Sequence, residues 1–328
     1  MKIAVVGGGS WGTAMARLLA MNGHAVTLAC RDPEQAEAVN RYHRNPRYLP
    51  DVMLPPEIRA AGFDQASLEG VELVAFAVPS AAFAASLRRF ADRLPADAAL
   101  LSLTKGLDPR DRRRMSEVLA TVAPAERIAV LSGPNHAEEV ARDFPTASVL
   151  ASLDTDLARR LQEQIGARRL RIYTSTDVIG VELCAAAKNV IGLAAGVSDG
   201  LGFGDNAKAA IITRGMAEMA RMGEGFGARA RTYSGLAGMG DLVATCTSRH
   251  SRNRKAGELL AKGVRAEWIE RDIGQVVEGL STSRALRDLA ADRGLELPIT
   301  SAVCDVAWGG VTATDALAAL MAREQTEE

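Results

Sequence analysis

The chain has 328 residues, of which 48% are hydrophobic and 24% are charged, close to the average of soluble globular proteins. Lys and Arg number 39 and Asp and Glu number 40, so the formal net charge of -1 excludes the strongly basic field of an indiscriminate nucleic-acid binder. Aromatic residues make up only 4%, which argues against a base-stacking surface. This length predicts two domains or one large one.

The first half of the chain alternates short β-rich runs with helix-like segments. The runs are apolar almost throughout, as is typical of strands that are covered on both faces. This alternation predicts an α/β fold in which residues 1–180 form a Rossmann-type, doubly wound parallel sheet. The predicted strands cover residues 2–6, 25–29, 73–78, 100–103, 128–131 and 147–151.

The pattern changes after about residue 174. From there on nearly every segment is rich in Ala, Leu, Glu and Arg at helical spacing, which predicts an all-helical domain over residues 181–328. The glycine-rich stretch 196–204 is predicted to be a loop or hinge between helices; a phosphate-binding nest is the alternative.

The positions of the cysteines, histidines and apolar stretches allow predictions about cellular compartment, metal binding and membrane spans. The four cysteines lie far apart, without a Cys-x-x-Cys pair, which is typical of buried thiols in a reducing compartment. The four histidines are equally scattered, so no metal site is predicted. The longest apolar stretch, 181–197, includes Glu182, Lys188 and Asn189, so no membrane span is predicted there, and the first residues lack a signal peptide. We expect a cytoplasmic protein.

Residues 7–12 read Gly-Gly-Gly-Ser-Trp-Gly, which fits the pattern G-x-G-x-x-G between a predicted strand and a predicted helix. In such a turn Gly7 permits the tight bend, Gly9 lets the backbone approach a pyrophosphate, and Gly12 lets the helix pack on the strand. The helix N-terminus offers N–H donors and a partial positive charge to the phosphates. We therefore predict a dinucleotide site, with an ordinary glycine-rich turn as the alternative.

The end of the second predicted strand bears on which dinucleotide binds. An NAD site usually has an acidic residue about 20 positions further on, which binds the ribose 2′-hydroxyl. Arg31 occupies that region here and can pair with a 2′-phosphate, whereas Asp32 would repel that phosphate if it pointed inward. This predicts that NADP(H) is preferred and NAD(H) is tolerated. The alternative is that Arg31 is a solvated charge at a strand end.

Two later strand ends carry polar residues, and ligands of open α/β sheets bind at the carboxyl ends of strands. Lys105 follows one predicted strand and can hold an anionic substrate or cofactor. Gly133 and Asn135 follow the next strand, where the glycine lets the backbone come close to a ligand. Asn135 can cap a helix or donate a hydrogen bond to a substrate.

The helical half offers three candidate groups. Lys188 lies on a predicted helix of small and apolar residues, which suits a general acid or base; the alternative is a lysine whose ammonium reaches solvent at a domain seam. Asp241 opens a predicted helix and could cap it, or could orient Lys188. The basic stretch 249–255 can grip a phosphate. A solvated face and a nucleic-acid patch are its alternatives, and the net charge disfavours the second.

Taken together, these segments resemble the bacterial-type NAD(P)-dependent glycerol-3-phosphate dehydrogenase family. The likeness follows the family's order and covers nearly the whole chain. It is carried by GGGSWGTA (7–14), NPRYLP (45–50), VPS (78–80), LTKGL (103–107), LSGPNHAEEVA (131–141), AAAKNVIGLAAG (185–196), GFGDNAKAAIITRGMAEM (202–219), SGLAGMGDLVATC (234–246), SRNR (251–254) and VVEG (276–279).

The resemblance implies interconversion of sn-glycerol 3-phosphate and dihydroxyacetone phosphate with a nicotinamide cofactor, for glycerophospholipid synthesis, by a homodimer. It also implies a helical domain similar to that of 6-phosphogluconate dehydrogenase, with Lys188 as the catalytic lysine. Residues matching substrate-contact positions are Lys105, Gly133, Asn135, Lys188, Asp241, Ser251, Arg252 and Asn253. Residues matching cofactor-contact positions are Ser10, Trp11, Arg31, Tyr48, Lys105, Ala137, Arg252, Val276 and Glu278.

One segment departs from the family pattern. The family commonly has Ser or Thr and then Phe after Ser-Gly-Pro, whereas this chain has Asn135 and His136. Asn135 can still hydrogen-bond a hydroxyl. His136 replaces an apolar ring beside the site, so we expect the local packing and the pH response of the site to differ from the family's. Two rival functions are another hydroxyacid dehydrogenase of the same superfamily and a dinucleotide sensor without turnover.

Overall fold

The structure of the chain, a computed structural model, describes residues 1–324. Two compact units make it up, and each is described by itself. The first comprises Met1–Asp108 and Arg113–Glu182, and the second comprises Pro109–Arg112 and the chain from Leu183 on. The sequence predicts a boundary after residue 180. No sequence pattern indicated that residues 109–112 group with the helices.

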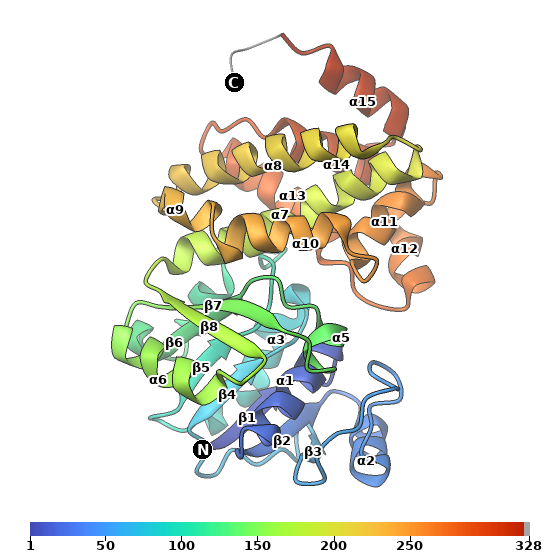
Figure 1. The fold of residues 1–328 in the computed structure, drawn as a ribbon. Helices are drawn as coiled ribbons and strands as arrows, with labels where there is room; N and C mark the ends of the chain where they lie inside the picture. Colours follow the sequence, from blue (N-terminus) through green and yellow to red (C-terminus); the bar gives the residue numbers. More distant parts are fainter. Residues whose placement is uncertain (325–328) are drawn as a thin grey trace. The chain divides into compact units, whose positions relative to one another are not determined.

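The first unit is built on one sheet of eight strands in the order β3-β2-β1-β4-β5-β6-β7-β8. Figure 1 draws them in blue to yellow-green. All neighbouring strands are parallel except β6 and β7, which pair antiparallel. The strands are β1 (Lys2–Val6), β2 (Ala25–Cys30), β3 (Arg59–Gly62), β4 (Leu73–Phe76), β5 (Ala99–Ser102), β6 (Ile128–Ser132), β7 (Thr146–Ser152) and β8 (Leu170–Ser175).

Helices cover both faces of this sheet, as the apolar runs predict. Alternate residues of β1 belong to different apolar clusters, Val5 to one and Val6 to the other, so each face has its own core. The helical elements of this unit are α1 (Ser10–Met21), α2 (Pro33–Tyr42), α3 (Ser80–Phe90), η1 (Ala91–Arg93), α4 (Met115–Leu119), η2 (Ala125–Arg127), α5 (Ala137–Val140) and α6 (Thr155–Ile165).

Three features of the sheet differ from the prediction. The edge strand β3 is four residues, Arg-Ala-Ala-Gly, and this composition has little β-propensity. The other edge strand, β8, was not predicted because Arg171 and Tyr173 are exposed, so it lacks the continuous apolar run of the central strands. The antiparallel β6–β7 pair was also missed; its connection holds only the four-residue α5, whereas parallel crossovers usually carry a full helix.

The second unit is helical: every regular element among its described residues is a helix (Figure 1). Its long helix α7 (Val178–Gly200) begins in the last residues of the first unit. By length and composition α7 could cross a membrane, but 94% of its most apolar window is buried inside the structure. The others are α8 (Asp205–Gly225), α9 (Ala230–Tyr233), the π-helical turn η3 (Leu236–Gly240), α10 (Asp241–Thr247), α11 (Arg252–Ala261), α12 (Ala266–Ile273), α13 (Glu278–Ala291), α14 (Pro298–Trp308) and α15 (Ala313–Met321).

The loop predicted over residues 196–204 is wrong in its first part, because α7 continues to Gly200. The glycines there serve helix packing. A Cβ on Gly196 would stand 1.9 Å from the carbonyl oxygen of Arg254, and a Cβ on Gly257 would stand 2.1 Å from that of Leu193. Helices α7 and α11 therefore approach backbone to backbone, which only glycine allows.

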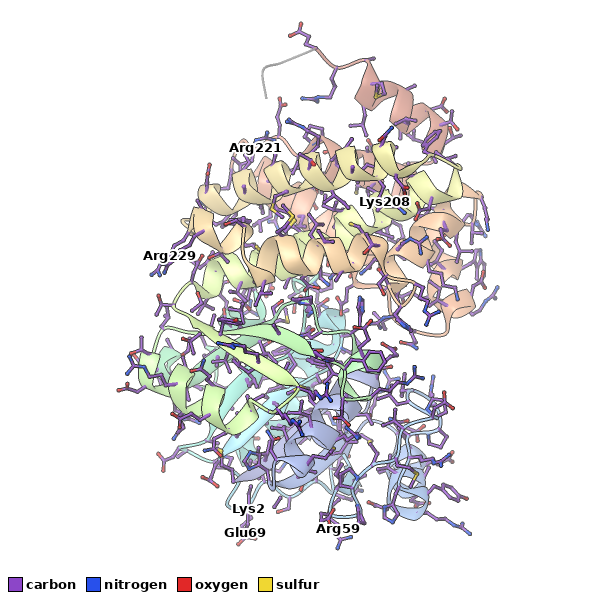
Figure 2. All side chains as sticks on the ribbon, in the orientation of Figure 1. Lys2, Arg59, Glu69, Lys208, Arg221 and Arg229 are labelled. Carbon is purple, nitrogen blue, oxygen red and sulfur yellow. The ribbon has the colours of Figure 1, made fainter. Side chains whose placement is uncertain are left out.

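An ion-pair network fixes the end of α7 to two neighbouring helices. Asp199 accepts hydrogen bonds from Lys208 Nζ at 2.8 Å and from Arg254 Nε at 2.5 Å. Lys208, labelled in Figure 2, extends from α8. Arg254 also contacts Glu258 at 3.0 Å. The side chain of Arg254 is thus committed to structure, although it belongs to the basic stretch predicted to bind phosphate.

Glu218 of α8 supplies a buried cap to α14. Its carboxylate accepts hydrogen bonds from the backbone N–H groups of Ile299 and Thr300 and from the Thr300 hydroxyl. Burial raises the pKa of Glu218 above its usual range, and the hydrogen bonds offset this only in part. Because the pKa is higher in the folded chain, ionisation of Glu218 lowers the free energy of unfolding as the pH rises from the unfolded-state pKa through the folded-state pKa.

We expect Glu218→Gln to remove this pH-dependent loss, because glutamine does not ionise. The Tm of the wild type minus that of the variant should therefore fall as the pH rises from about 5 to 8. Thermal melts followed by circular dichroism measure this difference. Glu224→Gln, at an exposed position of the same helix, is the control and should show a flat difference. A flat difference for Glu218→Gln as well would contradict the prediction.

Candidate active site

Four of the predicted segments follow strands of the first unit and meet at one edge of its sheet. The glycine loop follows β1, Arg31 follows β2, Lys105 follows β5, and Gly133 follows β6. These strands are mutually parallel, so their carboxyl ends lie on the same side. This is the edge at which open α/β sheets bind their ligands.

The glycine loop is tightly packed where the chain turns and open where a ligand is expected. Gly7 has φ +117°, and a Cβ there would lie 2.6 Å from the carbonyl oxygen of Ala77. A Cβ on Gly12 would lie 1.9 Å from the carbonyl oxygen of Gly7. Around Gly9, by contrast, a Cβ would meet no atom within 4 Å. Helix α1 begins at the next residue, so its first N–H groups, which have no intrahelical acceptors, border this open side.

Ser10, Trp11 and Tyr48 surround the start of α1. The Ser10 hydroxyl donates to the carbonyl oxygen of Tyr48 at 3.2 Å. The indole Nε1 of Trp11 is buried and has no hydrogen-bond partner among residues 1–324. Such a donor is rare unless a ligand or water completes it. Together with the open side of Gly9, it fits a bound dinucleotide, which these residues would hold.

Arg31 and Asp32 differ in their surroundings. Arg31 is exposed just after β2. Asp32 is the N-cap of α2, and its Oδ1 accepts the backbone N–H of Glu34 at 3.0 Å. Its carboxylate is therefore committed to the helix start.

Lys105 lies within a polar cluster at the ends of β5 and β6. Its Nζ donates to the carbonyl oxygen of Gly133 at 2.7 Å and to Asn135 Oδ1 at 2.6 Å. The Asn135 amide in turn donates to the Ser148 hydroxyl at 3.0 Å. Gly133 has φ +127°, and a Cβ there would lie 3.0 Å from Ser148 Cα. Ala137 is the first residue of α5 directly after this cluster.

In the second unit, Lys188 of α7 is only 5% exposed. Its Nζ donates to Asp241 Oδ1 and to the Thr245 hydroxyl, both at 2.9 Å. The predicted alternative of an ammonium that reaches solvent is therefore wrong. A lysine ammonium has three N–H donors, so this arrangement leaves one for a further acceptor.

Asp241 is the first residue of α10 and is 2% exposed. Its predicted alternative role as N-cap is wrong, because Gly240 holds that position. The preceding residues 236–240 form a π-helical turn, a distortion common at functional sites. A Cβ on Gly238 would lie 2.1 Å from the carbonyl oxygen of Tyr233, so this turn requires glycine there. Sequence reasoning missed Thr245; its spacing of four from Asp241, on one helix face, was the available signal.

After α10, Ser251 caps a helix and Arg252 is exposed. Ser251 is the N-cap of α11, and its hydroxyl accepts the N–H of Arg254 at 3.2 Å. Arg252 is exposed, and its Nη1 donates to the carbonyl oxygen of Val276 at 2.9 Å. Its planar guanidinium has further N–H donors for an anion. Glu278 begins α13 two residues after Val276.

Asn253 connects three helices. Its Nδ2 donates to Asn189 Oδ1 at 2.8 Å, and its Oδ1 accepts the N–H of Gly279 at 2.9 Å. Asn189 follows Lys188 on α7, and Gly279 lies in α13. Asn189 is a second residue whose part the sequence did not reveal, since nothing in its spacing connects it to residue 253.

The four cysteines are buried and unbridged, as predicted. Burial raises the pKa of Cys30 and of Cys246 to about 12, so both stay thiols at neutral pH. Cys246 lies next to Thr245 on α10, but because its pKa is raised it is not an activated nucleophile. Within residues 1–324, no group of three or more His, Cys, Asp or Glu side chains could hold a metal ion.

Comparison with known proteins gives full-length matches. Residues 2–158 match the family model described as NAD-dependent glycerol-3-phosphate dehydrogenase N-terminus, and residues 177–318 match that of the C-terminus. A relative from Oleidesulfovibrio alaskensis, named an NAD(P)+ glycerol-3-phosphate dehydrogenase, is 49% identical over 330 residues, with 100% of each chain covered. One of the same name from Corynebacterium glutamicum is 46% identical over 331 residues, again with 100% of each covered. The solved glycerol-3-phosphate dehydrogenase of Coxiella burnetii is 40% identical, with a TM-score of 0.93 over 98% of this chain and 99% of that one.

Proposed function

This chain belongs to the NAD-dependent glycerol-3-phosphate dehydrogenase family, and from this premise we propose that it reduces dihydroxyacetone phosphate to sn-glycerol 3-phosphate with NADPH. It is an NAD(P)-dependent glycerol-3-phosphate dehydrogenase. The reductive direction, the supply of glycerol 3-phosphate for glycerophospholipid synthesis and the preference for NADPH are the proposal.

The observation that carries the chemistry is the buried Lys188–Asp241 pair. Reduction of a ketone needs a hydride and a proton for the developing alkoxide; the nicotinamide supplies the hydride when it is bound. Lys188, as an ammonium, donates the proton to the carbonyl oxygen through the N–H that Asp241 and Thr245 leave unused. Asp241 is the counter-charge of the ammonium, and Thr245 fixes the direction of Nζ.

The two units take different parts in this proposal. The first holds the dinucleotide with the glycine loop, Trp11 and Arg31, and offers Lys105 to an anionic group. The second supplies Lys188 for proton transfer and Arg252 for the substrate phosphate. Ser251 and Asn253, whose polar groups cap α11 and join α7 to α13, hold the start of α11 in place beside Arg252.

The cofactor preference rests on the strand end after β2. Arg31 is exposed there, and Oδ1 of Asp32 accepts the backbone N–H of Glu34 at the start of α2. A guanidinium at this strand end favours the 2′-phosphate of NADPH over the 2′-hydroxyl of NADH.

We expect Arg31→Ala to weaken NADPH binding by roughly 1.5–3 kcal/mol and to change NADH binding little, since only NADPH carries the 2′-phosphate. Fluorescence titration of both cofactors measures the two dissociation constants. Arg59→Ala, which removes an exposed cation at the first residue of β3, is the control. Equal losses for NADPH and NADH in Arg31→Ala would show that this residue does not read the phosphate.

The test of the proposed function is the rate of dihydroxyacetone phosphate reduction, followed at the nicotinamide absorbance band with NADPH and NADH in parallel. Turnover that is faster with NADPH supports the proposal. Faster turnover of a 2-keto acid or of another ketone in a substrate panel would favour a related dehydrogenase, and cofactor binding without turnover would favour a sensor. The homodimer and the cytoplasmic location stay predictions.

A further inference from the structure

The carbonyl oxygen of Gly8, inside the glycine loop, accepts hydrogen bonds from side chains that come from two other segments. Asn45 Nδ2 donates to it at 2.8 Å, and Gln35 Nε2 donates to it from α2. These two are its amide donors, and the Thr13 hydroxyl of α1 also donates to it, at 3.5 Å. The second N–H of Asn45 donates to the Thr13 hydroxyl of α1 at 2.8 Å. The side chain of Asn45 thus bonds both the loop and the helix that follows it.

These bonds fix the orientation of one peptide plane. In a trans peptide the C=O and the following N–H point in opposite directions. When Asn45 and Gln35 hold the Gly8 carbonyl on their side, the N–H of Gly9 points the opposite way, and a Cβ on Gly9 would meet no atom within 4 Å. A peptide flipped by 180° would present a carbonyl oxygen to an anion and would repel it.

The position of Asn45 is energetically costly because it buries a polar side chain. It is fully buried, and its Oδ1 has no hydrogen-bond partner among residues 1–324. A rotated amide would set that oxygen against the Gly8 carbonyl, so the donor orientation is the only favourable one. The backbone of Asn45 also accepts the N–H of Tyr48 at 3.3 Å, and Ser10 bonds the Tyr48 carbonyl. The segment with Tyr48 and the glycine loop are therefore joined through Asn45.

We infer that Asn45 is a positioning residue for the cofactor pyrophosphate: it turns the Gly9 N–H toward the phosphates and ties the Tyr48 segment to the loop. This inference rests on the proposed function, since it requires a dinucleotide at the glycine loop. Asn45 itself touches no phosphate and acts through the Gly8–Gly9 peptide.

Asn45→Asp tests the inference with a readout that depends on a proton. The ionised carboxylate cannot donate to Gly8, so the Kd for NADH should rise by about tenfold at pH 8.5, the worth of one charge-assisted N–H contact. Burial raises the pKa of a carboxyl, so at about pH 6 the aspartic acid regains a donor and the ratio of variant to wild-type Kd should fall. NADH is the probe because it lacks the titrating 2′-phosphate.

Asn40→Ala is the matched control, because Asn40 also bonds backbone groups of the same unit. It donates to the carbonyl oxygen of Ala60 at 2.8 Å and accepts its N–H at 2.9 Å, away from the glycine loop. We expect both Asn40→Ala and Asn45→Ala to lower the Tm, with only Asn45→Ala weakening NADH. If Asn45 variants do not fold, Gln35→Leu removes the other donor to Gly8 and should raise the NADH Kd several-fold.

Three results separate the possible failures. Wild-type protein that binds neither NADH nor NADPH overturns the proposed function and this inference with it. Wild-type binding with Asn45 variants that bind NADH equally well at every pH overturns the inference alone. A loss of affinity in Asn40→Ala as large as in Asn45→Ala also overturns it, because the effect would then be general destabilisation.

Discussion

Lys188→Ala is expected to lower kcat for dihydroxyacetone phosphate reduction by at least about 10²-fold, while the affinity for NADPH stays near that of the wild type. The reason is geometric: Lys188 Nζ is held by two acceptors and keeps one N–H for the substrate oxygen. Steady-state kinetics at saturating NADPH and a fluorescence titration of NADPH measure the two quantities. Lys188→Arg should keep the charge yet recover little activity, since a guanidinium does not release its proton at neutral pH.

The variant also leaves the buried Asp241 without its partner, and breaking a buried pair typically costs about 3–5 kcal/mol of stability. The double variant Lys188→Ala with Asp241→Asn removes that charge and separates loss of chemistry from loss of fold. It should melt at a higher temperature than the single variant and remain as inactive. Added primary ammonium ions should restore part of the activity of Lys188→Ala. A near-normal kcat in a folded Lys188→Ala protein would remove this residue from the mechanism.

The central strands and the glycine loop could be predicted because local sequence determines them. The runs that form β1 and β4 are apolar on both faces, a pattern that only a doubly covered strand requires. The edge strand β3 was missed because its Arg-Ala-Ala-Gly composition has little β-propensity, and β8 was missed because its alternating burial lacks the continuous apolar run of the central strands. Gly196 was misread as part of a loop since a glycine required by close packing between helices looks the same in sequence as one required by a turn.

Lys188 and a role for Asp241 in orienting it could be predicted, but the contacts of Thr245 and Asn189 could not. The apolar surroundings of Lys188 indicated a buried lysine, and burial in turn requires a counter-charge. Orienting Lys188 was one of two roles predicted for Asp241, and the sequence could not decide between them because the pairing spans 53 residues and depends on how α7 and α10 pack. Asn45 went unnoticed for the same reason: its significance lies in the Gly8 carbonyl 37 residues earlier.

Arg252→Ala is expected to lower kcat/KM for dihydroxyacetone phosphate by at least about 10²-fold, since a guanidinium can make two charge-assisted hydrogen bonds to one phosphate. The loss should appear in both parameters: KM rises because the anchor is gone, and kcat falls because the phosphate also aligns the carbonyl for reaction. Arg252→Lys should recover only part of the loss, because a point charge lacks the bidentate geometry. The anchored guanidinium, with one N–H on the Val276 carbonyl, keeps its other donors for the anion.

Unphosphorylated dihydroxyacetone distinguishes a phosphate clamp from a structural role, because it has no group for Arg252 to hold. Its poor turnover should barely change in the variant. The ratio of kcat/KM for dihydroxyacetone phosphate to kcat/KM for dihydroxyacetone should therefore fall strongly. NADPH must be saturating throughout, since Arg252 matches a cofactor-contact position as well. Lys255→Ala removes an exposed cation of the same helix and should leave the ratio intact. If instead Lys255→Ala lowers the ratio and Arg252→Ala does not, the clamp is Lys255, because Arg254 is already bound to Asp199 and Glu258.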